Sequence, residues 1–441
     1  MGVWDIPYRG QSETVWYAAV SPSPSRQAVP LWKTLLAIAS LLVAALIWGS
    51  GLMNSLQRPS VNPSLSLQQQ ELVLLAEPAV PAGIRPVLVG SDPRDVLLQA
   101  LRSSSAEQRN QRQETLLALL EHESGEAVDV PLVLVDDPLV QQLSCEAQGG
   151  TAESCPDVQV ARAAAFRLGF SFGVPLISVL LGLGLLLRQG WGLVRHSKGP
   201  WPQVCGPALT LTDLTLLVAG GFVVLSALSV PLIALPIVTV LNTVLESPRR
   251  DAVGVVIEYS VMALPALLIL WRQLKALDSS CEPRGGWLQW RLRPLSSAVG
   301  SAVAGWLMVT PVVMLTGWLL VKTVGDPGGS NPLLEMVLQS RDPLALLLFG
   351  MTATVLAPFF EELIFRGALL PVLAKSFGSF WGVLVSALLF GLAHNSIGEL
   401  GPLTVLGIGL AVVRLGSGRL FPCFLMHALW NAITFTNLLL L

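Results

Sequence analysis

The sequence predicts an all-α membrane protein, namely a polytopic transmembrane helical bundle of about eight or nine spans with a small, mostly helical soluble insertion. Hydrophobic residues make up 52% of the 441 residues and charged residues only 13%, whereas a soluble domain carries about 25% charged residues. The apolar residues also gather in runs of about twenty, the length of a helix that crosses a bilayer. The formal net charge is −2, so the composition favours a lipid bilayer, and not a nucleic acid, as the partner.

The N-terminal part of the chain begins with a polar tail, residues 1–30, which precedes the first transmembrane anchor at 31–53. No small-x-small cleavage motif closely follows this apolar run, so we expect an anchor that stays uncleaved. Residues 54–167 form the soluble helical insertion. One of its helices is expected to begin at Asp92-Pro93, because an acceptor side chain followed by proline is typical of a helix start. A second helix is expected at about 106–121.

Two polar features of the insertion allow more than one interpretation. Cys145 and Cys155 share one loop; they can form a disulfide if the loop is extracytoplasmic, or remain two free thiols. His122 lies between two glutamates but lacks the His-Glu-x-x-His spacing of a metal site. We interpret His122 as part of a solvated helix end.

Two membrane regions follow the insertion. Residues 168–342 hold the helices of an N-terminal bundle, and 343–441 form a C-terminal transmembrane region. Pro358 disfavours a continuous helix, so the first run of the C-terminal region can divide there, which would aim helix N-terminal N–H groups at nearby carboxylates. The apolar runs predict spans at about 168–187, 212–241, 252–271, 295–321, 343–374, 379–396, 400–414 and 419–441.

Basic residues beside these spans predict the orientation, because short cytoplasmic loops are rich in lysine and arginine. With a cytoplasmic N-terminus, one set of basic residues falls entirely on the cytoplasmic side: Arg188, Arg195, Lys198, Arg272, Lys275, Arg284, Arg291, Arg293, Lys375, Arg414 and Arg419. We therefore expect a multi-pass integral membrane protein with its N-terminus in the cytoplasm and the insertion on the opposite side.

A set of polar residues lies inside the apolar C-terminal region. An ionised side chain at the centre of a bilayer costs roughly 2.5–3.5 kcal/mol, so such groups need a partner, a wet cavity or a function. The concentration of these groups predicts an active site within the membrane. The set consists of Glu361, Glu362, Arg366, His394, His427 and Asn431.

Helical spacing indicates how this set is arranged. Glu362 and Arg366 are four residues apart, so they share a helix face and are expected to form an orienting ion pair. Glu361 is turned about 100° away from its neighbour and is expected to act on something else. His427 and Asn431 are also four residues apart and share one face.

Two predicted turns bring these faces to one depth in the membrane. The first turn falls near Phe377–Gly378, about sixteen residues after Glu361 and about sixteen before His394. In an antiparallel helix pair both residues then lie at nearly the same depth. A second turn is predicted at 416–418. Counting residues on either side of this turn places the helix face that carries His427 near the same depth in the membrane. Three helices can thus present the set to one cavity.

Such a cavity suits peptide hydrolysis by an activated water molecule. Glu361 can take a proton from water as a general base, and His394 can orient that water. His427 and Asn431 can donate hydrogen bonds to the oxyanion of the tetrahedral intermediate. The motifs pair no serine, threonine or cysteine nucleophile with a histidine, so direct attack by water is favoured over an acyl-enzyme.

These residues resemble the motifs of the CPBP family, the CAAX proteases (type II CAAX prenyl endopeptidase-like) and bacteriocin-processing intramembrane proteases. The family pattern is Glu-Glu-x-x-x-Arg, Phe-x-x-x-His and His-x-x-x-Asn, and the three motifs occur here in order at 361–366, 390–394 and 427–431. The resemblance covers about 343–441 and implies an all-helical intramembrane endopeptidase that acts on membrane-embedded or lipidated proteins or peptides. It does not extend to 54–167.

The sequence allows alternatives on two questions: whether the protein uses a metal ion, and which class of function it has. Family members are usually described as metalloendopeptidases, and a metal-free glutamate mechanism is the alternative. We commit to no cofactor; if zinc is present, its expected ligands are Glu361, His394 and His427, with a fourth position open. One rival function is a non-catalytic scaffold or bacteriocin self-immunity protein of the same fold. The other is a proton- or ion-coupled transporter, although the chain shows no inverted repeat and confines its polar groups to one end.

Overall fold

The computed structural model describes residues 29–58, 60–81, 83–89, 92–103, 109–121, 131–150, 154–195, 204–326 and 328–441. Within these ranges the chain forms helices, turns and loops and no strand, so the predicted all-α class is confirmed. The chain divides into two compact units, which are described separately. Unit 1 holds the described residues up to 58 and Ser178–Phe435, and unit 2 holds Ser60–Ile177 and Thr436–Leu441.

Unit 2 is built from short helices and the first part of one long helix. α4 begins where the sequence predicts, because the Asp92 side chain accepts the N–H groups of Arg94 and Asp95 at 3.0 and 3.2 Å. His122 lies outside the described residues. The elements are α2 (Asn62–Ala76), η1 (Glu77–Ala79), α3 (Arg85–Leu88), α4 (Pro93–Ser103), α5 (Gln111–Glu121), η3 (Leu132–Leu134), α6 (Pro138–Ala147) and the start of α7 (Val158–Val194).

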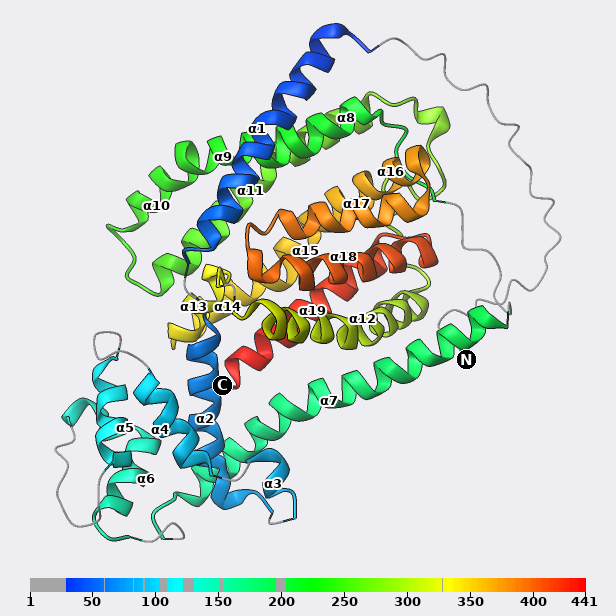
Figure 1. The fold of residues 1–441 in the computed structure, drawn as a ribbon. Helices are drawn as coiled ribbons and strands as arrows, with labels where there is room; N and C mark the ends of the chain where they lie inside the picture. Colours follow the sequence, from blue (N-terminus) through cyan, green and yellow to red (C-terminus); the bar gives the residue numbers. More distant parts are fainter. Residues whose placement is uncertain are drawn as a thin grey trace. The chain divides into compact units, whose positions relative to one another are not determined.

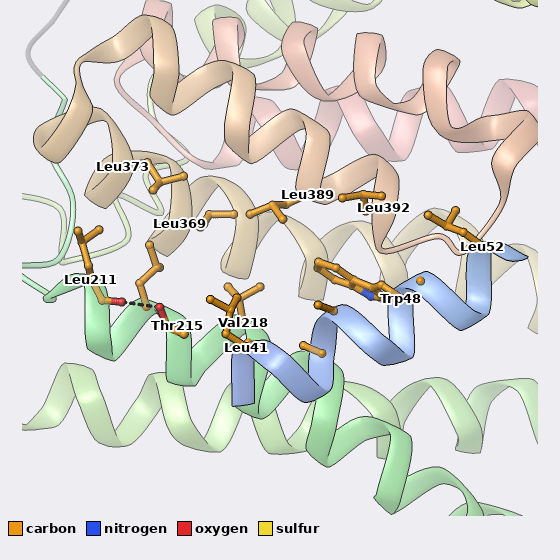
Figure 2. Close-up of a pocket in the computed structure, with 15 residues that line it drawn as sticks. Leu41, Trp48, Leu52, Leu211, Thr215, Val218, Leu369, Leu373, Leu389 and Leu392 are labelled. Atoms are coloured by element: carbon orange, nitrogen blue, oxygen red, sulfur yellow. Dashed lines mark hydrogen bonds between the residues drawn. The ribbon is translucent and has the colours of Figure 1, made fainter. Parts of the chain in front are cut away.

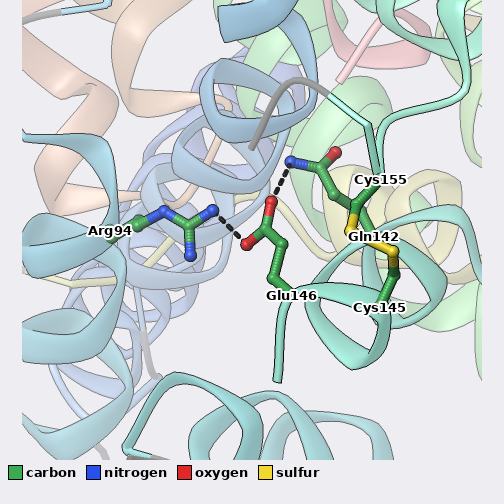
Figure 3. The surroundings of a disulfide bond; sticks show 5 residues. All are labelled: Arg94, Gln142, Cys145, Glu146 and Cys155. Atoms are coloured by element: carbon green, nitrogen blue, oxygen red, sulfur yellow. Dashed lines mark hydrogen bonds and ion pairs between the residues drawn. A yellow bond between two sulfur atoms is a disulfide. The ribbon is translucent and has the colours of Figure 1, made fainter. Parts of the chain in front are cut away.

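Leucine side chains and one arginine hold these short helices together. Arg112 pairs with Glu71 at 2.8 Å and with Asp137 at 2.7 Å, so one cation links three segments. A disulfide joins Cys145 to Cys155 (Figure 3). Beside it, the Glu146 carboxylate forms an ion pair with Arg94 and accepts a hydrogen bond from the side-chain amide of Gln142. The buried leucines of this core are Leu67, Leu74, Leu97, Leu101, Leu116, Leu119, Leu139 and Leu143.

Unit 1 contains most of the membrane-spanning helices. Seven of the described helices are long and apolar enough to cross a membrane, and two further predicted spans correspond to the short α17 and to α19. Seven of the nine helices at the predicted spans are α1 (Leu31–Ser55), α7, α11 (Arg249–Lys275), α12 (Leu295–Val324), α17 (Ser379–Leu392), α18 (Ile397–Ser417) and α19 (Phe421–Leu439).

The two other spans contain π-helical segments, and unit 1 also has two short connecting elements. The helix Leu211–Leu241 consists of α8 (Leu211–Thr215), η4 (Leu216–Leu225), α9 (Ser226–Ser229), η5 (Val230–Ala234) and α10 (Leu235–Leu241). The helix Pro343–Phe377 consists of α14 (Pro343–Met351), η7 (Thr352–Leu356), α15 (Ala357–Glu362), η8 (Leu363–Leu369) and α16 (Leu370–Phe377). The connecting elements are η6 (Ser279–Cys281) and α13 (Pro332–Gln339).

The Pro343–Phe377 helix does not break at Pro358, so that expectation is wrong. The π-helical segment η7 ends at Leu356, two residues before the proline, and the backbone stays helical at Leu356 and Ala357. A π segment changes the hydrogen-bond register from i→i+4 to i→i+5, which accommodates the proline without ending the helix. The carboxylates of Glu361 and Glu362 therefore lie in mid-helix and not at a helix N-terminus.

Four helices of unit 1 lie side by side, in the order α16, α17, α18 and α12 (Figure 1). The first predicted turn is present, since α16 ends at Phe377 and Gly378 takes a φ of +86° that favours glycine. α17 ends at Leu392, earlier than the predicted 396, because Ser396 caps the next helix by accepting the N–H of Glu399. His394 consequently lies in the turn after α17 and not within the helix.

Close packing of α16 against α17 depends on Gly382. A Cβ at this position would lie 2.7 Å from the backbone nitrogen of Ala374, so we expect Gly382→Ala to lower the free energy of unfolding by about 1–3 kcal/mol through overpacking. Gly401→Ala is the matched control, because its Cβ would meet only Thr316, at 3.5 Å. Unfolding in detergent micelles measures both variants, and equal stability of the two would contradict this account of the hairpin.

Candidate active site

Glu362, Arg366 and His427 form a buried cluster between the Pro343–Phe377 helix and α19. Arg366 Nη1 donates to Glu362 Oε1 at 3.1 Å, and both side chains are 0% exposed. His427 Nδ1 lies 3.0 Å from the same oxygen. Because a carboxylate can only accept, Nδ1 carries the proton of a neutral His427, and its Nε2 carries a lone pair.

Glu361 points to a different set of groups from its neighbour. Its Oε1 accepts a hydrogen bond from the hydroxyl of Tyr259 on α11. Its Oε2 is buried without a hydrogen-bond partner among the described residues and lies 3.9 Å from His427 Nε2. An unpaired buried carboxylate oxygen is costly, so it is either compensated by a bound molecule or retained for chemistry.

His394 reaches this cluster through an aromatic ring. Its Nδ1 lies 2.8 Å from the carbonyl oxygen of Phe390. The Phe390 ring stands 5.0 Å from the ring of His394 and 5.6 Å from that of His427, and the guanidinium of Arg366 lies 4.2 Å from it. Phe390 thus lies against both imidazoles and the buried arginine.

Asn431 faces the same long helix as His427, one turn further along α19. Its side-chain Nδ2 donates to the carbonyl oxygen of Ala353, in the π-helical segment η7, at 2.7 Å. An amide nitrogen carries two hydrogens, so one N–H group serves this contact and a second is available to a ligand.

A zinc site made of Glu361, His394 and His427 is not assembled. Among the described residues, no three histidine, cysteine, aspartate or glutamate side chains lie close enough together to hold a metal ion. Each side chain keeps one ligating atom free, because His394 uses only Nδ1 and Glu361 only Oε1 in the hydrogen bonds described above. The spacing of the three side chains is therefore what does not fit a three-ligand metal centre.

An apolar pocket of about 600 Å³ lies beside the helices that carry these residues. Figure 2 shows its leucine-rich walls, which α1 and the Leu211–Leu241 helix form on one side and the helices of Leu369 and Leu389 on the other. Leu369 is eight residues beyond Glu361, about 12 Å along the helix axis. None of the predicted site residues lines the pocket.

Tyr259 contacts Glu361 directly and is not among the site residues that the sequence predicts. It lies on α11, 102 residues before Glu361, and outside the three motifs. A signal was present, since Glu258, Tyr259 and Ser260 interrupt an otherwise apolar span. Polar groups within a span deserve a functional hypothesis by default.

Together, the fold and the cluster define a helical integral membrane protein with acidic and imidazole side chains buried among its helices. Residues 343–433 match the family model described as type II CAAX prenyl endopeptidase Rce1-like. This match confirms the resemblance that the sequence shows for the C-terminal region.

Two further comparisons describe other parts of the chain or give no function. Residues 62–132 match a family described only as a domain of unknown function. An "Uncharacterized 24.3 kDa protein" of Escherichia coli is 30% identical over 128 residues, which are 28% of this chain and 58% of that protein. The chain thus covers less than two thirds of that relative's length. No solved structure significantly matches the chain.

Proposed function

We propose that this protein is an intramembrane endopeptidase that hydrolyses peptide bonds with a water molecule activated by Glu361. One observation carries the proposal: Oε2 of Glu361, which has no hydrogen-bond partner among the described residues, lies 3.9 Å from His427 Nε2. Two hydrogen bonds of about 2.8 Å can span that distance through one water molecule. Both protons of such a water would face acceptors, so its oxygen lone pair would face a substrate carbonyl.

The proposed reaction needs no protein nucleophile. As the water oxygen bonds to the carbonyl carbon, Glu361 takes the departing proton and the carbonyl oxygen becomes an oxyanion. The C–N bond then breaks while Glu361 returns the proton to the leaving nitrogen. The products are a carboxylic acid and an amine, and Glu361 is again ionised.

The other residues of the set support this step in the proposal. Glu362 holds His427 in the required tautomer, and Arg366 compensates the charge of Glu362. Asn431 offers its second N–H group to the oxyanion. His427 can donate to the oxyanion only when Nε2 is protonated, so in the neutral cluster it orients the water, a role that it shares with His394.

The proposed substrates are membrane-embedded or lipidated proteins or peptides. Glu361 lies within Pro343–Phe377, a helix that is long and apolar enough to cross a bilayer, so a soluble peptide would have to leave water to reach it. The adjacent apolar pocket provides a surface for a hydrocarbon segment. Both observations support a substrate that is already in the membrane.

A comparison of membrane peptidomes tests the proposal. Cells that carry the native protein and cells that carry Glu361→Gln are expected to differ in a small set of cleavage products, which purified native protein should also generate in proteoliposomes. Identical peptidomes together with a full phenotype of the variant would favour the scaffold. Proton-dependent flux without any cleavage would favour the transporter.

We infer that the N-terminus lies in the cytoplasm and that the insertion, residues 54–167, lies on the opposite side of the membrane, where the Cys145–Cys155 disulfide is stable. In sealed right-side-out vesicles, an impermeant maleimide is expected to label Cys145 and Cys155 only after reduction. The exposed thiols Cys205 and Cys281 should react only after permeabilisation, and the buried Cys423 only after denaturation. Labelling of Cys205 in intact, unreduced vesicles would overturn this orientation.

A further inference from the structure

Tyr259 lies outside the residues that match the protease family, yet its hydroxyl reaches the side chain at the centre of the proposed chemistry. The hydroxyl donates to Glu361 Oε1. Its ring stacks on that of Phe360, with ring centres 6.4 Å apart and planes 14° from parallel. Tyr259 is the only tyrosine in the described part of the chain.

We propose that Tyr259 is a positioning residue for Glu361, which commits Oε1 to a fixed hydrogen bond and leaves Oε2 as the proton acceptor. A carboxylate has two equivalent oxygens and rotates about its last side-chain torsion, which is broad and roughly two-fold. A fixed donor on one oxygen removes that freedom. The remaining oxygen is then held 3.9 Å from His427 Nε2. This inference rests on the proposed function.

The ring contact explains why the hydroxyl can act as a fixed donor. Phe360 is the residue directly before Glu361, so Tyr259 stacks on the backbone neighbour of the carboxylate that it binds. The stacked ring cannot turn away without losing this contact. The helices α11 and α15 contact each other, and the Tyr259 hydrogen bond and the ring contact both link these two helices.

The charges around Glu361 indicate what loss of the hydroxyl should do. The groups that face Glu361 or adjoin it are His427 on α19, Tyr259 on α11, and Glu362 with Arg366 on its own helix. The hydrogen bonds of Arg366 go to Glu362 and to the carbonyl oxygen of Gly407. Tyr259 is thus the side chain that donates a hydrogen bond to Glu361 among the described residues.

The test is Tyr259→Phe, which keeps the ring stacking and removes only the hydroxyl. Without the hydroxyl, Glu361 Oε1 loses its donor and the carboxylate can rotate, so Oε2 is held less firmly toward His427 Nε2. We expect kcat to fall about ten- to hundredfold with little change in KM, because the substrate still binds while the base is misaligned. Ser260→Ala, which removes an exposed hydroxyl one residue along, should leave both values unchanged.

A second measurement separates this inference from the proposed function. The vibrational band of the Glu361 carboxyl group, identified as the band that Glu361→Gln removes, can be recorded by infrared difference spectroscopy without any substrate. In Tyr259→Phe the frequency of that band should change, because one carboxyl oxygen has lost its hydrogen-bond donor. If native protein cleaves nothing, the proposed function fails and the infrared shift still decides the role of Tyr259. A lower kcat with an unmoved band overturns the inference.

Discussion

Replacing Glu361 with glutamine is expected to lower kcat for peptide cleavage by about 10²- to 10⁴-fold, because an amide cannot accept the proton that water must lose. The fold should persist. The glutamine oxygen can still accept the hydroxyl hydrogen bond of Tyr259, and the substitution removes a buried negative charge. The amide NH₂ can face the lone pair of His427 Nε2. We therefore expect a melting temperature at or above that of the native protein.

Single-turnover cleavage of a membrane-anchored peptide in proteoliposomes measures this loss, and thermal unfolding in detergent measures the stability. Glu335→Gln is the matched control, since it neutralises an exposed carboxylate on α13 and should leave both values unchanged. Activity of Glu361→Gln within tenfold of native would remove Glu361 from the proposed mechanism. A large loss of stability would instead indicate that the carboxylate has a structural function.

Replacing Arg366 with methionine is expected to lower the free energy of unfolding by about 3–5 kcal/mol, because it leaves the buried charge of Glu362 without its partner. Neither side chain is exposed to solvent, so water cannot compensate the charge. The guanidinium also donates to the carbonyl oxygen of Gly407 at 3.1 Å, which ties the Pro343–Phe377 helix to α18. Denaturant unfolding in micelles provides the measurement.

A double variant distinguishes stability from function at this pair. Glu362→Met combined with Arg366→Met removes both charges and should recover most of the lost stability, since a buried ion pair is often replaced by apolar side chains at little cost. Cleavage should stay lost, because His427 Nδ1 then has no carboxylate to donate to. Arg341→Met, at an exposed position, controls for loss of an arginine. A stable but inactive single variant Arg366→Met would contradict the predicted cost.

Several local features of the site could be predicted from residue spacing alone. The Glu362–Arg366 ion pair follows from four-residue spacing in a helix and is present at 3.1 Å. The turn at Phe377–Gly378 follows from a glycine between two apolar runs and is present with a positive φ. These features depend on residues near each other in the chain, so helical geometry is enough to place them.

Other predictions failed where one local preference competed with another. Pro358 disfavours a helix, but the π-helical segment before it keeps the helix continuous. The apolar run predicts a helix that extends to His394, but α17 ends at Leu392 and Asn395 takes a φ of +48°. Asparagine adopts this left-handed conformation more readily than most residues, so a signal for the helix end was present in the sequence.

By itself the sequence determined that this chain crosses a membrane as helices and that its polar residues gather in three motifs near one end. The length of an apolar run and the spacing of its residues are properties of the local chain. The free energy of transferring such a run into lipid does not depend on which helices are its neighbours. The tertiary structure alone decided which atoms meet. His427 reaches Glu362 across 65 residues, and Tyr259 reaches Glu361 across 102. Such contacts depend on how helices pack side by side, and no local pattern specifies that packing.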